Sequence, residues 1–183
     1  MSTLLTLDTA TATGWAFGPV DNLSECEYGT ITLENTGDDL GSFFAEFEDR
    51  LRDLIQSLKP ELLVFEAPIL YRTNTQKKIL RKLYGLTAYA ETTGLKAQVR
   101  VAEADLTDIR THFIHRTQAP RSIPKKDRTK WLKGTIMEQC RRMGWNPEND
   151  NEGDALALRS FVIWKATGFL HPTLVTDLFQ EAG

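Results

Sequence analysis

The segment that most constrains the fold is a short predicted strand whose four central residues are all apolar. Residues 61–66 read ELLVFE, which is typical of a strand covered on both faces. The strand follows residues 40–58, where apolar side chains recur at helical spacing until Pro60 ends the pattern. A strand before this helix and a strand after it fit a parallel crossover. We therefore expect a sheet that is flanked by helices.

The rest of the pattern predicts an α/β fold with a mixed five-stranded sheet. The first three strands form an antiparallel meander, since turn residues such as VDNLS separate them. The expected strands are 3–8, 14–18, 27–33, 61–66 and 97–101. The expected helices are 40–58, 75–92, 105–115, 129–143 and 152–166. Residues 116–128, with two prolines, are predicted to be a loop or a mobile arm, and the tail after Gly168 to dock or to fray.

Composition limits the class of protein. A chain of 183 residues with 41% hydrophobic content can bury one core, so a single domain over residues 1–183 is expected. No apolar run reaches the length of about 18 residues that a membrane span requires, and the first residues lack the pattern of a signal peptide. Cys26 and Cys140 lie far apart without CxxC spacing, which argues against a disulfide framework or a zinc site. We expect a soluble, cytoplasmic protein with reduced thiols and no membrane partner.

The net charge of −3 hides an uneven distribution of charge. Residues 110–142 hold ten lysines and arginines against two acids, whereas acids gather in residues 34–66 and 148–154. A second basic run without acids consists of Arg72, Lys77, Lys78, Arg81 and Lys82. The molecule is therefore expected to be electrically two-sided. Either basic run alone is explained equally well by a solvated helix face, but both together favour binding to a phosphate backbone.

Three acids stand where the fold pattern predicts a common site. Asp8 ends the first strand and Glu66 the fourth, and if these strands are parallel neighbours their carboxylates share one edge of the sheet. Asp154 opens a helix whose apolar residues would press it onto the sheet. An acid in a first helical turn is also favoured by the helix macrodipole without any catalytic role, so this alternative stays open. Carboxylates that face one another without a cation raise each other's pKa.

Such a group of carboxylates predicts a site for hard divalent metal ions. Mg²⁺ prefers oxygen ligands and keeps several water molecules, which leaves room for phosphate oxygens of a substrate. Two ions about 4 Å apart can activate an attacking water and stabilise the leaving oxygen of a phosphodiester. Residues 9–14 are small, and we expect them to leave space for a nucleic-acid backbone.

Three segments of the chain resemble a known family. LDTATATGWAF, LLVFEAP and NEGDALAL, with their spacings, are similar to the RuvC-like Holliday junction resolvases, especially the phage-type branch, within the RNase H-like superfamily. The resemblance extends from about Leu4 to Trp164. It implies an RNase H-like fold, with a mixed five-stranded sheet flanked by helices. It also implies a metal-dependent, homodimeric endodeoxyribonuclease that resolves four-way junctions and other branched DNA by paired nicks, leaving 5′-phosphate and 3′-hydroxyl ends.

The resemblance assigns roles to single residues. Asp8, Glu66 and Asp154 fall on three of the family's acidic metal ligands and are the expected catalytic residues. The family's fourth acid is Asn151 here, whose amide carbonyl can still ligate a metal; Asp150 or Glu152 could replace it. The expected cofactor is two Mg²⁺ ions per site, with Mn²⁺ as a substitute. The expected DNA-binding residues are Tyr71, Arg72, Lys77, Lys78, Arg121, Lys125, Lys126, Arg128 and Lys130.

Some of these roles have alternatives. Ile69, Leu70 and Tyr71 resemble the family's segment that inserts into the junction centre, but Tyr71 packing at a dimer interface is equally compatible with the sequence. Lys125, Lys126 and Lys130 are expected to clamp a phosphate or to stabilise charge that develops on it. His112 and His115 are spaced as metal ligands could be, yet the basic helix around them has no cysteine, which argues against that role.

Other functions were weighed against the nuclease. The segment DTATATG resembles the phosphate loop of actin-like ATPases, but Ala10 stands where that loop has glycine, and 183 residues cannot form two lobes. Asn151 keeps open a non-catalytic scaffold that only binds branched DNA. An RNase H-like nuclease that acts on RNA/DNA hybrids stays open as well, because the same metal site serves several substrates.

Overall fold

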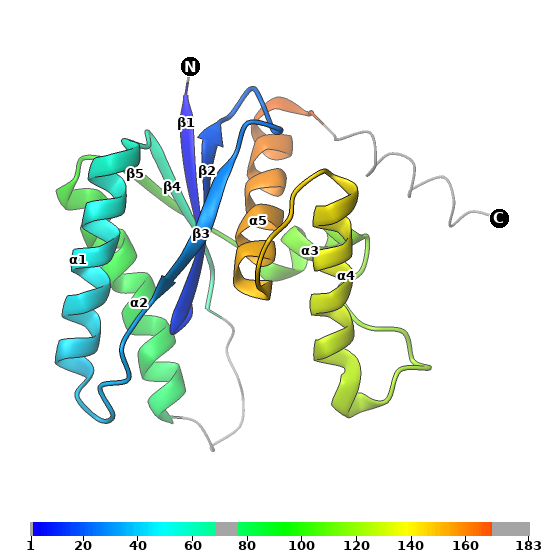
Figure 1. The fold of residues 1–183 in the computed structure, drawn as a ribbon, viewed down its shortest axis with the longest axis horizontal. Helices are drawn as coiled ribbons and strands as arrows, with labels where there is room; N and C mark the ends of the chain where they lie inside the picture. Colours follow the sequence, from blue (N-terminus) through cyan, green and yellow to red (C-terminus); the bar gives the residue numbers. More distant parts are fainter. Residues whose placement is uncertain (1, 69–76, 170–183) are drawn as a thin grey trace.

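The structure is a computed structural model that describes residues 2–68 and 77–169 (Figure 1). Its strands are β1 (Thr3–Asp8), β2 (Ala12–Pro19), β3 (Glu27–Thr32), β4 (Leu62–Glu66) and β5 (Arg100–Ala104). Its helices are α1 (Leu40–Leu58), α2 (Lys77–Lys96), α3 (Leu106–Ile114), the short 3₁₀ helix η2 (Lys125–Asp127), α4 (Arg128–Arg142) and α5 (Asp150–Thr167). The expected element order is confirmed, including the antiparallel meander at the start.

The five strands form one mixed sheet in the order β3-β2-β1-β4-β5. β1 pairs antiparallel with β2 and parallel with β4, and β4 pairs parallel with β5. The predicted crossover from β1 through α1 to β4 is therefore present. This order makes β1 and β4 the central neighbours of the sheet, so their carboxyl ends lie side by side.

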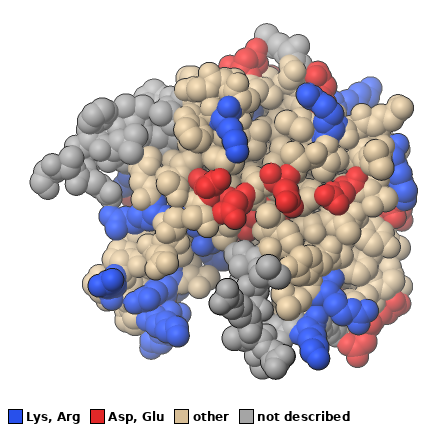
Figure 2. All heavy atoms as spheres, turned by 180° about the vertical axis from the view of Figure 1, so that it is seen from behind, with Lys and Arg blue, Asp and Glu red and all other residues tan. Residues whose placement is uncertain are grey.

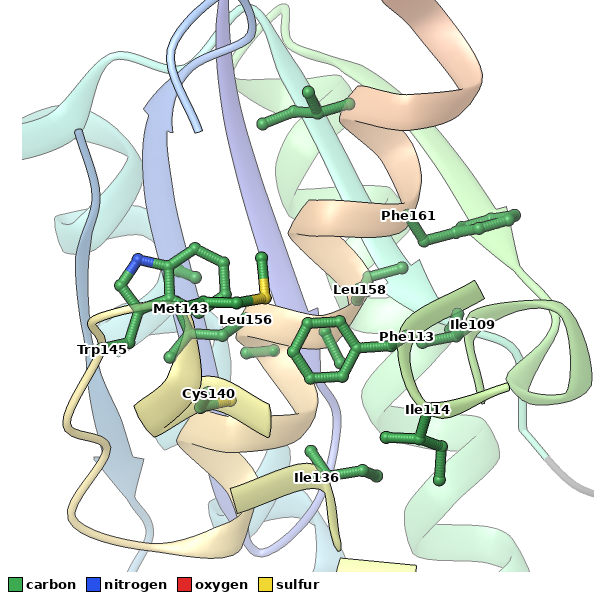
Figure 3. Close-up of a cluster of buried hydrophobic side chains, with 14 of the residues drawn as sticks. Ile109, Phe113, Ile114, Ile136, Cys140, Met143, Trp145, Leu156, Leu158 and Phe161 are labelled. Carbon is green, nitrogen blue, oxygen red and sulfur yellow. The ribbon is translucent and has the colours of Figure 1, made fainter. Parts of the chain in front are cut away.

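Helices cover both faces of the sheet, as Figure 1 shows: α1 and α2 lie on one face, and α5 with α3 and α4 lies on the other. On the first face, Phe43, Phe47 and Leu51 of α1 are completely buried against the strands. On the second face, α5 contributes most of its length to the core, and Phe113 of α3 and Cys140 of α4 pack around it (Figure 3). The fold is thus a three-layer α/β arrangement with two apolar cores.

The alternation of side chains along β1 decides which layer Asp8 faces. Leu5 and Leu7 belong to the core beneath α1 and α2, whereas Leu4 packs in the core beneath α5. Because successive side chains of a strand point to opposite faces, Asp8 lies on the α5 side with Leu4 and Thr6. In β4, Val64 belongs to the α5 core and Phe65 to the other one, so Glu66 lies on the α5 side too.

The predicted position of β5 was wrong by three residues. The sequence predicted a strand over 97–101, and the structure has it at Arg100–Ala104. Helix α2 continues to Lys96, and a turn with Gln98 in the left-handed region (φ 60°) follows. β5 is an edge strand whose residues are mostly exposed, so its apolar alternation is weak. The predicted end of α2 at residue 92 was also wrong, because the helix continues through Gly94, whose missing side chain lets Val101 pack against it.

The prediction for residues 116–128 holds in outline. Apart from the single turn of η2, these residues form a loop, and Ala119 anchors it in the core. Helices α3 and α4 match their predicted ranges to within a residue at each end. Among the described helices, none combines the length and the apolar character of a membrane span. The tail after Gly168 lies outside the described residues from position 170 onward.

Candidate active site

Asp8 and Glu66 lie next to each other at one edge of the sheet. The paired register of β1 and β4 ends with Leu7 opposite Phe65, and Asp8 and Glu66 are the next residues of the two strands. Both side chains lie on the α5 side and both are half-buried. The prediction that these two carboxyls share one edge of the sheet is therefore confirmed.

Two contacts hold the first turns of α5 against this edge. The buried hydroxyl of Thr6 donates to the carbonyl oxygen of Ala155, at 2.8 Å. Gly14, which pairs with Asp8 across β1 and β2, lies directly beneath Asn151, because a Cβ on Gly14 would be 1.9 Å from the Asn151 carbonyl oxygen. Only glycine fits there. At Gly14 the missing side chain makes room for α5, not for the nucleic-acid backbone that we expected.

The residues at the start of α5 form a hydrogen-bonded network that does not include Asp154. Asn149 caps the helix and accepts a hydrogen bond from the backbone N–H of Glu152, at 3.1 Å. The buried carboxylate of Glu152 accepts from the Thr30 hydroxyl and from the backbone N–H of Glu148. Glu152 is thus a structural acid and does not replace a metal ligand.

Asp154 does not open α5 but is its fifth residue, in the second turn. The macrodipole explanation therefore applies to Asp150 and Glu152, which lie in the first turn, and not to Asp154. The apolar residues after Glu152 predicted a helix start at that residue, whereas α5 begins at Asp150. Asn149 and Asp150 are the actual cap and first residue, as their residue types allow.

The three carboxyls influence one another electrostatically. Burial, then the charges of Asp154 and Glu66, raises the pKa of Asp8 well above its ordinary value. Burial and the charge of Asp154 raise the pKa of Glu66 to about 7. Burial raises the pKa of Asp154 to about 6, although Lys133 and Arg110 oppose that shift. Asp8, Glu66 and Asp154 therefore form one acidic cluster in which like charges are gathered at a cost.

Two cations that the sequence did not single out face this cluster. Lys133 of α4 forms an ion pair with Asp150, and its charge acts to lower the pKa of Asp8, Glu66 and Asp154. Partial burial disfavours the charged Lys133, but the bond to Asp150 and the surrounding acids outweigh it and raise its pKa. Spacing could have pointed to it, because Lys126, Lys130 and Lys133 recur at helical intervals. Sequence alone did not show which of them turns inward.

The second cation is Arg110 of α3. Its charge acts on Glu66 and Asp154, and its Nε atom is buried without a hydrogen-bond partner among the described residues. Arg110 lines a half-open pocket of about 410 Å³ with Ala67, Asp105 and Thr117, directly after the end of β4. A guanidinium with an unused donor beside carboxylates is suited to an anionic group such as a phosphate.

The carboxylate oxygens of the acidic cluster are of the chemical type that binds a divalent metal ion. Among residues 2–68 and 77–169, no group of three or more histidine, cysteine, aspartate and glutamate side chains is arranged so that it could hold a metal ion. The chemistry of the site nonetheless fits Mg²⁺, because carboxylate oxygens are its preferred ligands. Burial is the main reason why the pKa values of these three carboxyls are raised, and a bound cation would favour their ionised form. Asp8, Glu66 and Asp154 would hold the ion, whereas Asn151 lines a pocket with Thr30 and Glu152 to which none of these three acids contributes.

Solved structures with the same architecture are junction resolvases. RuvC of Thermus thermophilus in complex with a Holliday junction substrate superposes with a TM-score of 0.64 at 12% identity, over 92% of this chain and 97% of that one. A second Thermus thermophilus RuvC structure gives 0.60 at 14% identity, over 91% and 96%. The yeast mitochondrial Holliday junction resolvase Ydc2 gives 0.61 at 14% identity, over 90% and 79%.

The chain has the RuvC-like fold. This confirms the predicted RNase H-like sheet, whereas the phage-type branch stays a prediction. No protein-family model and no curated protein matches the sequence. The RuvC-like architecture is thus recognised from its tertiary structure at an identity of 12–14%.

The other predicted site residues differ in exposure and in the contacts that they make. Lys77, Arg121, Lys125, Lys126 and Lys130 are exposed. Arg128 is half-buried, and its Nε donates to the Ile123 carbonyl at 3.1 Å, which gives it a structural role in the loop. Ile69, Leu70, Tyr71, Arg72 and the side chain of Lys78 lie outside the described residues. Of the basic residues that the structure describes, Lys77, Arg121, Lys125, Lys126, Arg128 and Lys130 are not among the cations whose charge acts on the acidic cluster, as Lys133 and Arg110 are.

His112 belongs to the core rather than to a metal site. It is buried, its Nε2 lies 3.0 Å from the Ser160 hydroxyl, and its ring stacks on Trp164. Burial lowers its pKa to about 4, so the ring is neutral at physiological pH.

The surface charge is less clearly divided than expected. Figure 2 shows one face on which acidic side chains form a band across the middle, with lysines and arginines around it. Both signs therefore occur on the same face.

Proposed function

We propose that this chain is a metal-dependent, structure-selective endodeoxyribonuclease that resolves Holliday junctions and other branched DNA. The observation that carries the proposal is the acidic cluster. Asp8 and Glu66 end two parallel neighbouring strands, and Asp154 reaches the same face from α5, in a fold shared with RuvC and Ydc2. A protein that only had to be stable would not gather three carboxyls with raised pKa values.

The proposed reaction is hydrolysis of a phosphodiester. The oxygen of a water molecule bonds to phosphorus, the bond from phosphorus to the 3′ oxygen breaks, and that oxygen takes up a proton, so that a 5′-phosphate and a 3′-hydroxyl remain. Bound Mg²⁺ supplies Lewis acidity at the phosphate and lowers the pKa of a bound water. The protein's part is to hold the carboxylates of Asp8, Glu66 and Asp154 on one side of the phosphate.

Arg110 and the exposed lysines have separate tasks in this proposal. Arg110 lines the pocket beside Glu66, where its guanidinium binds a phosphate next to the cleaved one. Lys125, Lys126 and Lys130 are exposed along η2 and the start of α4, where they hold the DNA backbone and contribute affinity without reading sequence.

Resolution of a four-way junction requires two nicks that are symmetry-related. A homodimer with a two-fold axis provides two such sites, and we propose this assembly for the chain. One solved RuvC structure contains a Holliday junction substrate, which supports branched DNA as the partner.

The decisive experiment compares substrates and metals. The protein is incubated with a synthetic four-way junction, a Y-shaped fork, a linear duplex and an RNA/DNA hybrid, each in Mg²⁺, in Mn²⁺ and in EDTA. We expect paired nicks in opposing strands of the junction, with ends that a ligase can reseal, and no cleavage in EDTA. The variant D8N serves as the control that binds but does not cut.

Other outcomes select the alternatives. Preferred cleavage of the hybrid would make the chain an RNase H-like nuclease. Tight junction binding without cleavage in either metal would make it a branched-DNA scaffold, as Asn151 in place of an acid allows. Cleavage by D8N at the wild-type rate would overturn the assignment of the site.

A further inference from the structure

A second pocket lies beside the acidic cluster, on the side of β3. It is half-open, has a volume of about 720 Å³ and is formed by β3 together with the residues before α5 and in its first turn. The residues that line it are Ala12, Tyr28, Gly29, Thr30, Thr32, Asn146, Glu148, Asn149, Asn151 and Glu152. Asp8, Glu66 and Asp154 do not contribute to its lining, so the pocket is distinct from the acidic cluster.

The pocket is close enough to the acidic cluster to hold part of the same DNA strand. In the sheet order β3-β2-β1, β3 lies about 10 Å from β1, which ends at Asp8. Asn151, which lines the pocket, precedes Asp154 by about 4.5 Å along the axis of α5. A strand whose phosphodiester lies at the acidic cluster can therefore place a nearby nucleotide in the pocket.

The charges around the pocket do not suit a phosphate. Glu148 and Glu152 are among the described residues that line it, and no lysine or arginine is. The pocket on the opposite side of the acidic cluster, after the ends of β4 and β5, contains Arg110. A phosphate is expected at that guanidinium, and an uncharged polar part of a nucleotide in the pocket beside β3.

Asn146 is held in place while its side chain is exposed to the pocket. Its backbone N–H donates to the Tyr28 hydroxyl at 3.0 Å. The residues on either side of it, Trp145 and Pro147, are buried, and Trp145 belongs to the core cluster of Figure 3. The side-chain amide of Asn146 makes no hydrogen bond among the described residues. A fixed amide with an unused donor and an unused acceptor suits an uncharged partner that offers both.

The outer edge of β3 adds unpaired backbone groups. β3 is an edge strand, and the Leu33 N–H just after it donates to the Thr11 carbonyl at 3.2 Å. Because hydrogen-bonded pairs alternate along two antiparallel strands, the N–H and C=O groups of Thr30 and Thr32 point away from β2. Both residues line the pocket. The pocket thus combines donors and acceptors at neighbouring positions, as the edge of a nucleobase does.

We propose that this pocket binds a nucleobase of the strand that is cut, close to the cleaved phosphodiester, and that the side-chain amide of Asn146 reads this base. The inference rests on the proposed nuclease function and extends it, because it makes cleavage depend on the base at one position. Asn146 is a specificity-determining residue in this arrangement, and the phosphate contacts elsewhere supply most of the affinity.

The first part of the test removes single bases from the substrate. Four-way junctions that carry one abasic nucleotide, placed in turn at each position near the nick, are cut by the wild-type protein in Mg²⁺ under single-turnover conditions. We expect one position at which the missing base lowers the cleavage rate by about tenfold, the size of one hydrogen-bonded base contact. Junction affinity in a gel-shift assay should change by less than about twofold.

The second part uses two variants that change exposed amides. N146A should cut the intact junction about tenfold more slowly than the wild type, and the abasic nucleotide should slow it no further, because the base and the amide act as a pair. Q56A is the matched control. Gln56 is also exposed and lines a pocket, but that pocket lies at the opposite edge of the sheet with Lys59 and Arg100. Q56A should keep the wild-type rate and the wild-type response to the abasic nucleotide.

The possible outcomes separate this inference from the proposed function. Junction cleavage that no abasic nucleotide slows would overturn the inference and leave the nuclease proposal standing. An abasic effect that persists undiminished in N146A would overturn the assignment of the base to this pocket. A response to an added 2′-hydroxyl at that position, and not to the base, would mean that the pocket holds the sugar and would overturn it as well. No cleavage of any junction by the wild type would overturn the proposed function and this inference with it.

Discussion

Two groups of buried charge in this molecule differ in how far the protein compensates them with hydrogen-bond partners. Arg159, in the middle of α5, is completely buried, and its terminal nitrogens donate to the carbonyls of Pro19, Asn22, Leu23 and Glu25 at 2.8–3.1 Å. The acidic cluster includes Asp154, five residues earlier in the same helix, and no comparable set of donors to its carboxyls is found among the described residues. Burial raises the pKa of all three carboxyls, and the charge of Asp154 raises those of Asp8 and Glu66 further.

The contrast shows how a structural charge differs from a functional one. At Arg159 backbone carbonyls accept hydrogen bonds from both terminal nitrogens of the guanidinium, and this fixes the connection between β2 and β3. The Nε of Arg159 is buried without a partner among the described residues. Gly18 is part of this arrangement, since a Cβ there would lie 2.7 Å from an Arg159 nitrogen. At the acidic cluster the protein does not fully compensate the negative charge of the carboxylates, so a bound cation has to supply the remaining positive charge.

The largest expected effect comes from neutralising one acid of the cluster. Asp8→Asn should reduce cleavage by about 10³-fold or more, because a metal ion contributes several kcal/mol of transition-state stabilisation. Junction binding should persist, since the basic surface is unchanged. Single-turnover cleavage and gel-shift assays measure the two effects separately. An equal loss of binding and cleavage would place Asp8 in the DNA-binding surface instead.

The reciprocal experiment removes the structural charge. Arg159→Met should destabilise the fold by about 3–5 kcal/mol, because several buried carbonyls lose their donor at about 1–3 kcal/mol each. Chemical denaturation measures this as a lower midpoint at unchanged slope. Lys165→Met is the control on the same helix. Lys165 is exposed and lies 5.5 Å from the Phe161 ring, so its loss should cost no more than about 1 kcal/mol.

The stability of the metal-free protein should also depend on pH because of the acidic cluster. Glu66 and Asp154 have folded-state pKa values of about 7 and about 6, above their ordinary values of 4.5 and 3.8. The unfolded chain therefore releases protons first, and these groups make stability fall as pH rises from about 4 to about 7. Below pH 4 both states are protonated and the cost vanishes.

Asp154→Asn should remove part of that cost. In EDTA at pH 7.5 the variant should be more stable than the wild type by about 1–3 kcal/mol, with no gain at pH 4. Mg²⁺ should raise the stability of the wild type but not of the variant. Denaturation midpoints at both pH values, with and without metal, provide the measurement. A variant that is less stable at pH 7.5 would show that Asp154 has a structural role like that of Arg159.

An effect of similar size is expected where Gly14 of β2 contacts the first turn of α5. Gly14→Ala would place a Cβ 1.9 Å from the Asn151 carbonyl and push α5 outward, at a cost of about 1–3 kcal/mol. Mn²⁺ affinity should fall with it, because Asn151 and Asp154 move. Gly134→Ala in α4 is the control: nothing lies near its Cβ, so it should be neutral or stabilising by up to about 1 kcal/mol. Calorimetric titration and thermal unfolding distinguish the two variants.

Most of the fold was predictable because its signals are local. The apolar periodicity of 40–58 matches α1 to the residue, and the run LLVF marks β4. β5 was displaced by three residues because an exposed edge strand carries little apolar alternation. The start of α5 was missed because its cap is polar and precedes the apolar pattern.

The acids of the site were predictable, but the cations that face them were not. Asp8 and Glu66 interrupt apolar strands, which makes them visible in the sequence. Lys133 stands among ten basic residues between 110 and 142, and its neighbours Lys125, Lys126 and Lys130 looked at least as suitable. All of them are charged, and only the packing of α4 against α5 selects one.

By itself, the sequence determined which elements form, which strands are buried and which acids end them, because these properties follow from the order of side chains along a few residues. The tertiary structure decided which charges meet. Lys133 reaches Asp150, and Arg159 reaches the carbonyls after β2, across separations of 17 and more than 130 residues. Such distances depend on how helices pack on the sheet, since long-range contacts are set by the whole core and not by local periodicity.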